Sequence, residues 1–161
     1  MLQRPRRTGG MAVSYKPQVR FQRANFVVKD IDRALTFYRD VLGFSEEFRL
    51  PHNPESYSIE VFEIPGDATI GFSVLSAPDQ PRVMALTQVS NPDPTPVPHP
   101  RRSAIVLDCA DPDAVVAGAV ALGLKVYDEE VLKTHDGRTG REIGIVDFDD
   151  NLVVIYLIPE A

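Results

Sequence analysis

Two arginines and a glutamate are the residues of this chain best suited to ligand chemistry. Arg23 lies in an apolar strand pattern. A guanidinium there can anchor a carboxylate, a phosphate or an enolate, because it stays charged and offers a planar fork of donors. Arg141 lies in a later strand pattern, where it serves either as a ligand contact or as a charge at the rim. Glu60 alternates with Ile59 and Val61, and a buried carboxylate at that position could act as a base.

Each of these residues also has a structural explanation, and the sequence leaves both open. Arg23 could form an internal salt bridge with Glu60 or Glu142. Glu60 could simply face solvent.

The other residues that often carry chemistry predict no catalytic centre. His52 and His135 lie in turn segments and His99 in a proline-rich segment, without a metal-ligand spacing, which is typical of surface histidines. The single cysteine, Cys109, excludes an intramolecular disulfide, and its apolar surroundings predict a buried thiol. The sequence contains no nucleophile elbow, phosphate-binding glycine loop or dinucleotide fingerprint.

The composition predicts a soluble globular protein of the cytoplasm. A chain of 161 residues with 43% hydrophobic residues can bury a sizeable core. The formal charge of −6 argues against a nucleic-acid partner, and no apolar run is long enough to cross a membrane. Residues 1–19 are expected to form a disordered or extended tail, because they carry several arginines and no apolar core.

An internal repeat is the strongest signal of the fold. Each half contains a strand pattern, an aspartate suited to cap a helix, an amphipathic helix and a glycine stop. Asp30 and Gly43 bound the first helix, and Asp111 and Gly123 bound the second. The near-equal spacing favours a duplication.

Three strand patterns follow each helix, which makes each half a βαβββ module. The expected strands are 44–50, 57–64 and 69–75 in the first half, and 124–131, 141–146 and 152–158 in the second. The modules are therefore residues 20–76 and 103–158. Residues 77–102 hold seven of the 14 prolines and are expected to be a linker, or a lid that covers a pocket or partner. Within this segment, residues 83–90 could form an edge strand or the lid.

Several segments of the sequence resemble the vicinal oxygen chelate superfamily, which includes glyoxalases, bleomycin resistance proteins and extradiol dioxygenases. The resemblance rests on the run from Val28 to Ala34, on Phe37-Tyr38, on the run from Val41 to Phe44, and on the turn from Asp147 to Leu152. It implies an α+β fold in which two tandem βαβββ modules form curved half-barrel sheets around a cleft, often within a homodimer.

Metalloenzymes of that superfamily hold a divalent ion with side chains from the first and last strands of each module. The matching positions here are Arg23, Ala104, Val154 and, in the first module, a position near Gly71 to Ser73. None of these positions offers a suitable ligand for a divalent ion, because they hold a cation, a methyl group, an isopropyl group and at best a hydroxyl. We therefore expect no metal at the usual site, no cofactor, and none of the reactions that need a metal as Lewis acid.

Strand alternation predicts which residues line the cleft. The expected ligand-binding residues are Arg23, Asn25, Ser73, Val106, Arg141, Val154 and Tyr156. Such a lining is mostly apolar with a few polar groups, as in many small-molecule sites.

Three functions fit these features. The first is a metal-free protein that binds a small hydrophobic or aromatic molecule. The second is a metal-independent isomerase, epimerase or lyase that uses Arg23 and a carboxylate such as Glu60. The third is a structural or regulatory dimer without a ligand, since apolar residues at these positions would also fill a closed core.

Overall fold

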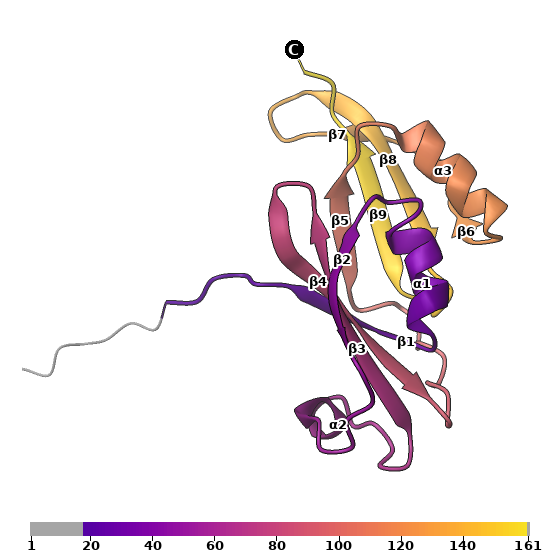
Figure 1. Ribbon diagram of the computed structural model, residues 1–161. Helices are drawn as coiled ribbons and strands as arrows, with labels where there is room; N and C mark the ends of the chain where they lie inside the picture. Colours follow the sequence, from indigo (N-terminus) through magenta and orange to yellow (C-terminus); the bar gives the residue numbers. More distant parts are fainter. Residues whose placement is uncertain (1–17, 161) are drawn as a thin grey trace, which may run out of the picture.

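The computed structural model describes residues 18–160 of the chain, so most of the predicted tail lies outside the described residues. It confirms an α+β fold with two open sheets (Figure 1). No helix within residues 18–160 is long and apolar enough to cross a membrane.

The first module forms a four-stranded sheet in the order β1-β4-β3-β2. Its elements are β1 (Ala24–Val28), α1 (Ile31–Tyr38), β2 (Ser45–Leu50), α2 (Tyr57–Val61), β3 (Thr69–Ala77) and β4 (Gln80–Ser90). β1 and β4 run parallel, whereas β2, β3 and β4 are antiparallel neighbours.

The second module repeats this topology in the order β5-β9-β8-β6, with β7 also paired to β8. Its elements are β5 (Ala104–Asp108), α3 (Pro112–Ala121), β6 (Lys125–Val126), β7 (Glu130–Lys133), β8 (Thr139–Val146) and β9 (Leu152–Leu157). β5 pairs with β9 in parallel, as β1 pairs with β4. β9 is therefore the counterpart of β4.

Helix capping sets the same start and end in both modules. The Asp30 and Asp111 side chains accept hydrogen bonds from backbone N–H groups three residues later, at 2.9 and 3.0 Å. Gly43 and Gly123 have φ angles of 82° and 75°, a left-handed conformation that glycine adopts without strain. Both helices are thus confirmed.

Two segments of the first module differ from the prediction. Residues 57–64 were expected to be a strand, but they begin with helix α2, whose N-cap is Ser56. Residues 77–102 were expected to be a linker, but β4 occupies 80–90 and lies between β1 and β3. The prolines surround β4 rather than interrupt its ladder: only Pro81 lies within the strand, near its start, where the register with β3 is irregular.

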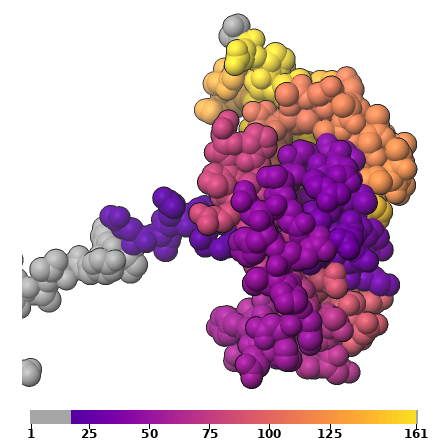
Figure 2. All heavy atoms as spheres, in the orientation of Figure 1, coloured from indigo at the N-terminus to yellow at the C-terminus, as the bar shows by residue number. Residues whose placement is uncertain are grey.

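One hydrophobic core joins the two modules. It contains buried residues of α1 and of the first sheet, Val115 and Ala119 of α3, and Ile143, Ile145, Val153 and Ile155 of the second sheet. Helix α3 approaches the turn after α1 closely, because a Cβ atom at Gly118 would lie 2.8 Å from a methyl group of Val41. Figure 2 shows the purple and orange parts of the chain in direct contact along this side.

Candidate functional site

The second sheet has one face that the helices leave open. Ile143, Ile145, Val153 and Ile155 point into the shared core. The alternate residues therefore share the opposite side, which we call the open face. The open face consists of Ala104, Val106, Asp108, Glu142, Gly144, Leu152, Val154 and Tyr156.

A cavity of about 530 Å³ lies on this open face. Its floor is formed by Gly144, Leu152 and Val154 from the two central strands. Its other lining residues are His99, Pro100, Arg101, Tyr127, Asp128, Glu130 and Glu142. An apolar floor surrounded by a few polar groups is typical of a small-molecule site.

Tyr127 forms an aromatic wall of the cavity. Its backbone N–H donates to the Gly144 carbonyl at 2.9 Å, so its ring lies beside Gly144. A Cβ atom at Gly144 would come within 3.1 Å of the ring, which explains the missing side chain. Arg101 donates to the Tyr127 hydroxyl at 3.2 Å, and the Lys125 ammonium lies 4.5 Å from the ring centre. Hydrogen bonding with Lys125 and Arg101 lowers the pKa of Tyr127 below its ordinary value.

Three of the predicted ligand-binding residues share the open face. Val154 lines the cavity directly, Val106 is its neighbour on β5, and Tyr156 lies opposite Glu142. Val106 is 60% exposed, so no side chain of the described chain closes this face over it. Their role in binding stays a prediction.

Arg23 and Asn25 lie with the first sheet instead. The Asn25 side chain accepts a hydrogen bond from Thr87 at 2.9 Å. Arg23 is half-buried just before β1 and, among the residues described, pairs with neither Glu60 nor Glu142. Glu60 is exposed on α2. The arginine–carboxylate pair required by the isomerase hypothesis is therefore not assembled from these residues.

Ser73 and Arg141 point to the helix-covered sides of their sheets, which corrects their assignment to the cleft lining. Ser73 is fully buried and donates to Glu46 at 2.7 Å. Arg141 donates to Glu129 at 2.7 Å and to Asp113 of α3 at 2.6 Å. Both side chains are already engaged by carboxylates.

The proline-rich segment after β4 lies over two hollows. Residues 93–97 border a cavity of about 370 Å³ together with Val27, Val89 and Asn151. Residues 99–101 border the cavity on the open face. This part of the expected linker borders both hollows, and its predicted role as a lid stays a prediction.

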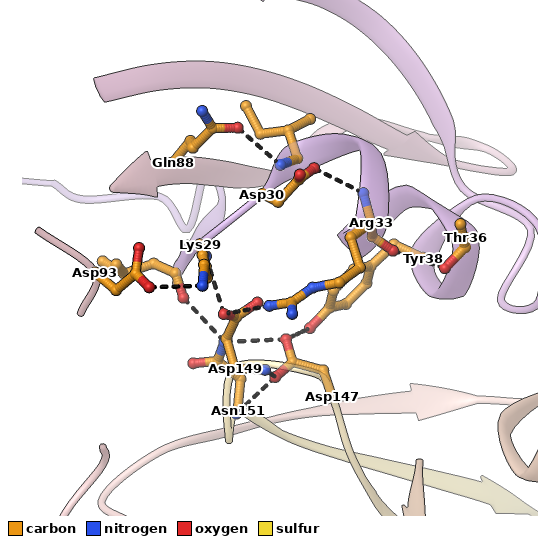
Figure 3. A network of polar contacts seen from close by, with 12 residues as sticks. Lys29, Asp30, Arg33, Thr36, Tyr38, Gln88, Asp93, Asp147, Asp149 and Asn151 are labelled. Atoms are coloured by element: carbon orange, nitrogen blue, oxygen red, sulfur yellow. Dashed lines mark hydrogen bonds and ion pairs between the residues drawn. The ribbon is translucent and has the colours of Figure 1, made fainter. Parts of the chain in front are cut away.

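A turn between β8 and β9 connects the modules through buried hydrogen bonds (Figure 3). The Asp147 carboxylate accepts from the Tyr38 hydroxyl at 2.8 Å, from the Asn151 amide at 3.0 Å, and from the backbone N–H groups of Asp149 and Asn151 at 2.8 Å each. The Asn151 amide also donates to the Val27 carbonyl at 3.1 Å. The turn therefore binds both the first strand and the first helix of the other module.

Burial shifts the pKa values of the hydrogen-bonded pair Asp147 and Tyr38. Burial raises the pKa of the Asp147 carboxyl above its ordinary value, although the hydrogen bonds that it accepts oppose the shift. Burial and the neighbouring Asp147 carboxylate raise the pKa of Tyr38 well above its ordinary value. Tyr38 therefore stays a neutral donor.

The next turn residues hold the start of α1. The Asp149 carboxylate accepts from the Lys29 backbone at 2.9 Å and from the Arg33 guanidinium at 3.0 Å (Figure 3). The same guanidinium lies 5.1 Å from the ring centre of Phe148. Phe148 thus adds a contact between this turn and α1.

Asp150 connects the turn to the wall of the cavity. Its carboxylate binds Arg101, and its backbone carbonyl accepts from the same guanidinium at 3.2 Å. Asp150 adopts a φ of 68°, a left-handed conformation that favours glycine. The side chain thus provides a contact that glycine could not.

Comparisons with known proteins agree with this fold. A family model of the Glyoxalase/Bleomycin resistance protein/Dioxygenase superfamily matches residues 20–155. The chain belongs to this superfamily. No curated protein sequence matches it significantly.

Solved structures of superfamily proteins are similar over most of their length. A glyoxalase family protein from Bacillus cereus has a TM-score of 0.71 and 17% identity, over 92% of this chain and 100% of the other. A protein from Frankia has a TM-score of 0.64 and 13% identity, over 90% and 96%. The fosfomycin resistance protein FosX of Listeria monocytogenes, solved with Mn(II) and sulfate, has a TM-score of 0.54 and 14% identity, over 84% and 88%. At these identities the likeness shows the fold.

The positions that hold a metal in resembling enzymes carry unsuitable side chains here. The strand pairing corrects one of them: the first-module counterpart of Val154 lies on β4 rather than on β3. Val154 is in register with Val106, and Ala85 is in register with Asn25, the equivalent residue of β1. Arg23, Ala85, Ala104 and Val154 offer no ligand for a divalent ion. Within residues 18–160, no three His, Cys, Asp or Glu side chains are grouped to hold one.

Several residues of the cavity were not predicted as site residues. Tyr127, Glu130, Gly144 and Arg101 are brought together only by strand pairing and by the loop before β5. Gly144 had a detectable signal, because a glycine inside a strand pattern often marks a close approach.

Proposed function

We propose that this protein binds a small hydrophobic or aromatic molecule on the open face of its second sheet, without a divalent metal at the superfamily's usual position. The observation that carries the proposal is the cavity with its floor of Gly144, Leu152 and Val154 and its wall of Tyr127. An aromatic ring that lies on this floor would bury apolar surface against both strands and stack against Tyr127.

The ligands named for FosX are not expected here. Mn(II) would meet no donors at the four equivalent positions, and sulfate would meet the carboxylates of Asp128, Glu130 and Glu142 at the rim. A neutral or positively charged ligand fits this surface better.

Titration calorimetry with 2-naphthalenemethanol tests the proposal. We expect binding to the wild-type protein and at least tenfold weaker binding to Val154→Trp, because the indole fills the floor of the cavity. Val131→Trp is the matched control, because Val131 is an exposed valine on the other face of the same sheet, and it should bind like the wild type. Failure of the wild-type protein to bind would favour the structural-dimer hypothesis.

A proton-transfer enzyme is the second candidate. Tyr127, with its lowered pKa, and Glu142 line the same cavity, so an acid and a base face one bound molecule. A simple binding protein returns its ligand unchanged, whereas an isomerase or lyase converts it.

We also propose that the protein forms a homodimer in the cytoplasm. Val19 and Phe21 precede β1 and are 96% and 79% exposed, and the segment around them projects from the body of the molecule (Figure 2). Val106 adds a third exposed apolar side chain at the open edge strand β5. Large exposed apolar groups of this kind are typical of interfaces. Native mass spectrometry is expected to give twice the chain mass, and Val19→Ser with Phe21→Ser to give the monomer; a wild-type monomer would contradict the proposal.

A further inference from the structure

The rim of the cavity on the open face carries negative charge that no cation of the described chain balances. Asp128, Glu130 and Glu142 border the cavity. None of them takes part in an ion pair within residues 18–160; His99 and Arg101, which line the same cavity, pair with Asp150, and Arg141 pairs with Asp113 and Glu129. The apolar floor therefore lies beneath three free carboxylates.

The strand register places two of these carboxylates directly opposite each other. Glu130 of β7 pairs with Glu142 of β8, and both side chains point to the open face. Directly opposed residues of antiparallel strands have Cβ atoms about 5 Å apart, and like charges at this spacing are destabilising. The same row continues across the sheet to Tyr156 and Asp108.

Nearby cations are committed to other partners. Arg101 lines the cavity, but its guanidinium binds Asp150 and the Tyr127 hydroxyl. Lys125 lies over the ring of Tyr127. Glu130 and Glu142 thus have no counter-ion within residues 18–160. A lysine or arginine in place of either one would have supplied it.

We infer that the ligand of this cavity is an amphipathic organic cation. Its apolar or aromatic body lies on Leu152 and Val154 against Tyr127, and its ammonium or amidinium group lies between Glu130 and Glu142. The two glutamates then supply charge-assisted hydrogen bonds next to a surface that excludes water. This inference rests on the proposed function and adds the charge of the ligand to it.

Three probes that share a naphthalene ring test the inferred charge of the ligand separately from the proposed binding function. We would measure by calorimetry the affinities of 2-naphthylmethylammonium, 2-naphthalenemethanol and 2-naphthoate for the wild-type protein at low salt. The ammonium compound is expected to bind about tenfold more tightly than the alcohol, the naphthoate more weakly, and the advantage of the cation to shrink as salt is added.

Substitutions then assign the preference to the opposed pair. Glu130→Gln combined with Glu142→Gln should remove the advantage of the ammonium compound and keep the affinity for the alcohol. The double variant should also melt at a higher temperature than the wild type, because it removes a like-charge contact. Glu129→Gln is the control, because Glu129 borders the same strands but binds Arg141, and it should keep the preference.

The outcomes are distinguishable. Equal affinities of the wild type for the ammonium compound and the alcohol would overturn the inference and leave the proposed function standing. Retention of the preference in the double glutamine variant, or cation binding that Val154→Trp does not weaken, would also overturn it. Failure of all three probes to bind would contradict the proposed function itself.

Discussion

Substitution of Asp147 by alanine is expected to lower the free energy of unfolding by about 4 kcal/mol, a large part of the stability of a domain of this size. The carboxylate accepts four hydrogen bonds in a buried site between the two modules. Its removal leaves the buried Tyr38 hydroxyl and two part-buried backbone N–H groups without these acceptors, at a cost of about 1–3 kcal/mol for a fully buried group. Urea denaturation monitored by circular dichroism would measure the loss.

Asp136→Ala is the matched control for this prediction. Asp136 lies in a turn as Asp147 does and binds Arg138, but its side chain is 43% exposed, so little change in the free energy of unfolding is expected. A similar loss in both variants would show that the buried network has no special role.

The pH dependence of Asp147 provides a second check. Because burial raises its pKa in the folded state, the native protein binds more protons than the unfolded chain from the ordinary pKa upwards to the raised pKa. The stability of the wild type relative to Asp147→Asn should therefore decrease as the pH rises through this window and level off above it. An increase would show that the four donors outweigh burial.

Gly140→Ala is expected to destabilise the protein by about 3 kcal/mol. A Cβ atom there would lie 2.3 Å from the backbone carbonyl oxygen of Leu157 and 3.1 Å from the Ile158 side chain. A backbone atom cannot rotate away as a long side chain can, so β8 and β9 must separate where β9 ends. The same denaturation experiment would measure this effect.

Gly66→Ala is the matched control, since no atom lies within 4 Å of a Cβ atom at that position. It should be neutral or slightly stabilising, because alanine reduces the freedom of the unfolded chain. A neutral result for Gly140→Ala would mean that the β8–β9 ladder tolerates a wider spacing than its register suggests.

Local signals in the sequence were sufficient for helices α1 and α3 and for most of the second module, although the single strand expected at 124–131 is divided into β6 and β7. The N-caps Asp30 and Asp111 and the glycine stops act through contacts within a few residues, so they can be recognised without knowledge of the fold. Strand β4 was expected at most as an edge strand at 83–90, and its central place between β1 and β3 could not be recognised in this way. Its neighbours β1 and β3 are chosen by long-range pairing, and the proline density around it indicated a loop.

The error over β4 also explains the wrong assignment of Ser73. With 69–75 taken as the last strand of the first module, Ser73 was assigned to the cleft, whereas the actual last strand places Ala85 there. Alternation within a correctly placed strand was informative, because Val154 and Val106 do share the open face. Arg101 and Tyr127 come from loops, whose positions periodicity does not encode.

The left-handed conformation of Asp150 suggests a conflict between two kinds of improvement. Glycine at this position would relax the backbone, so a search for thermostable variants would tend to select it. The same change would remove the carboxylate that pairs with the Arg101 guanidinium, which donates to the Tyr127 hydroxyl, and leave only the backbone carbonyl as its acceptor at this position. The protein would then be more thermostable, but its cavity wall would be less ordered. Selection for thermostability would therefore favour glycine at position 150, whereas selection for ligand binding would favour aspartate.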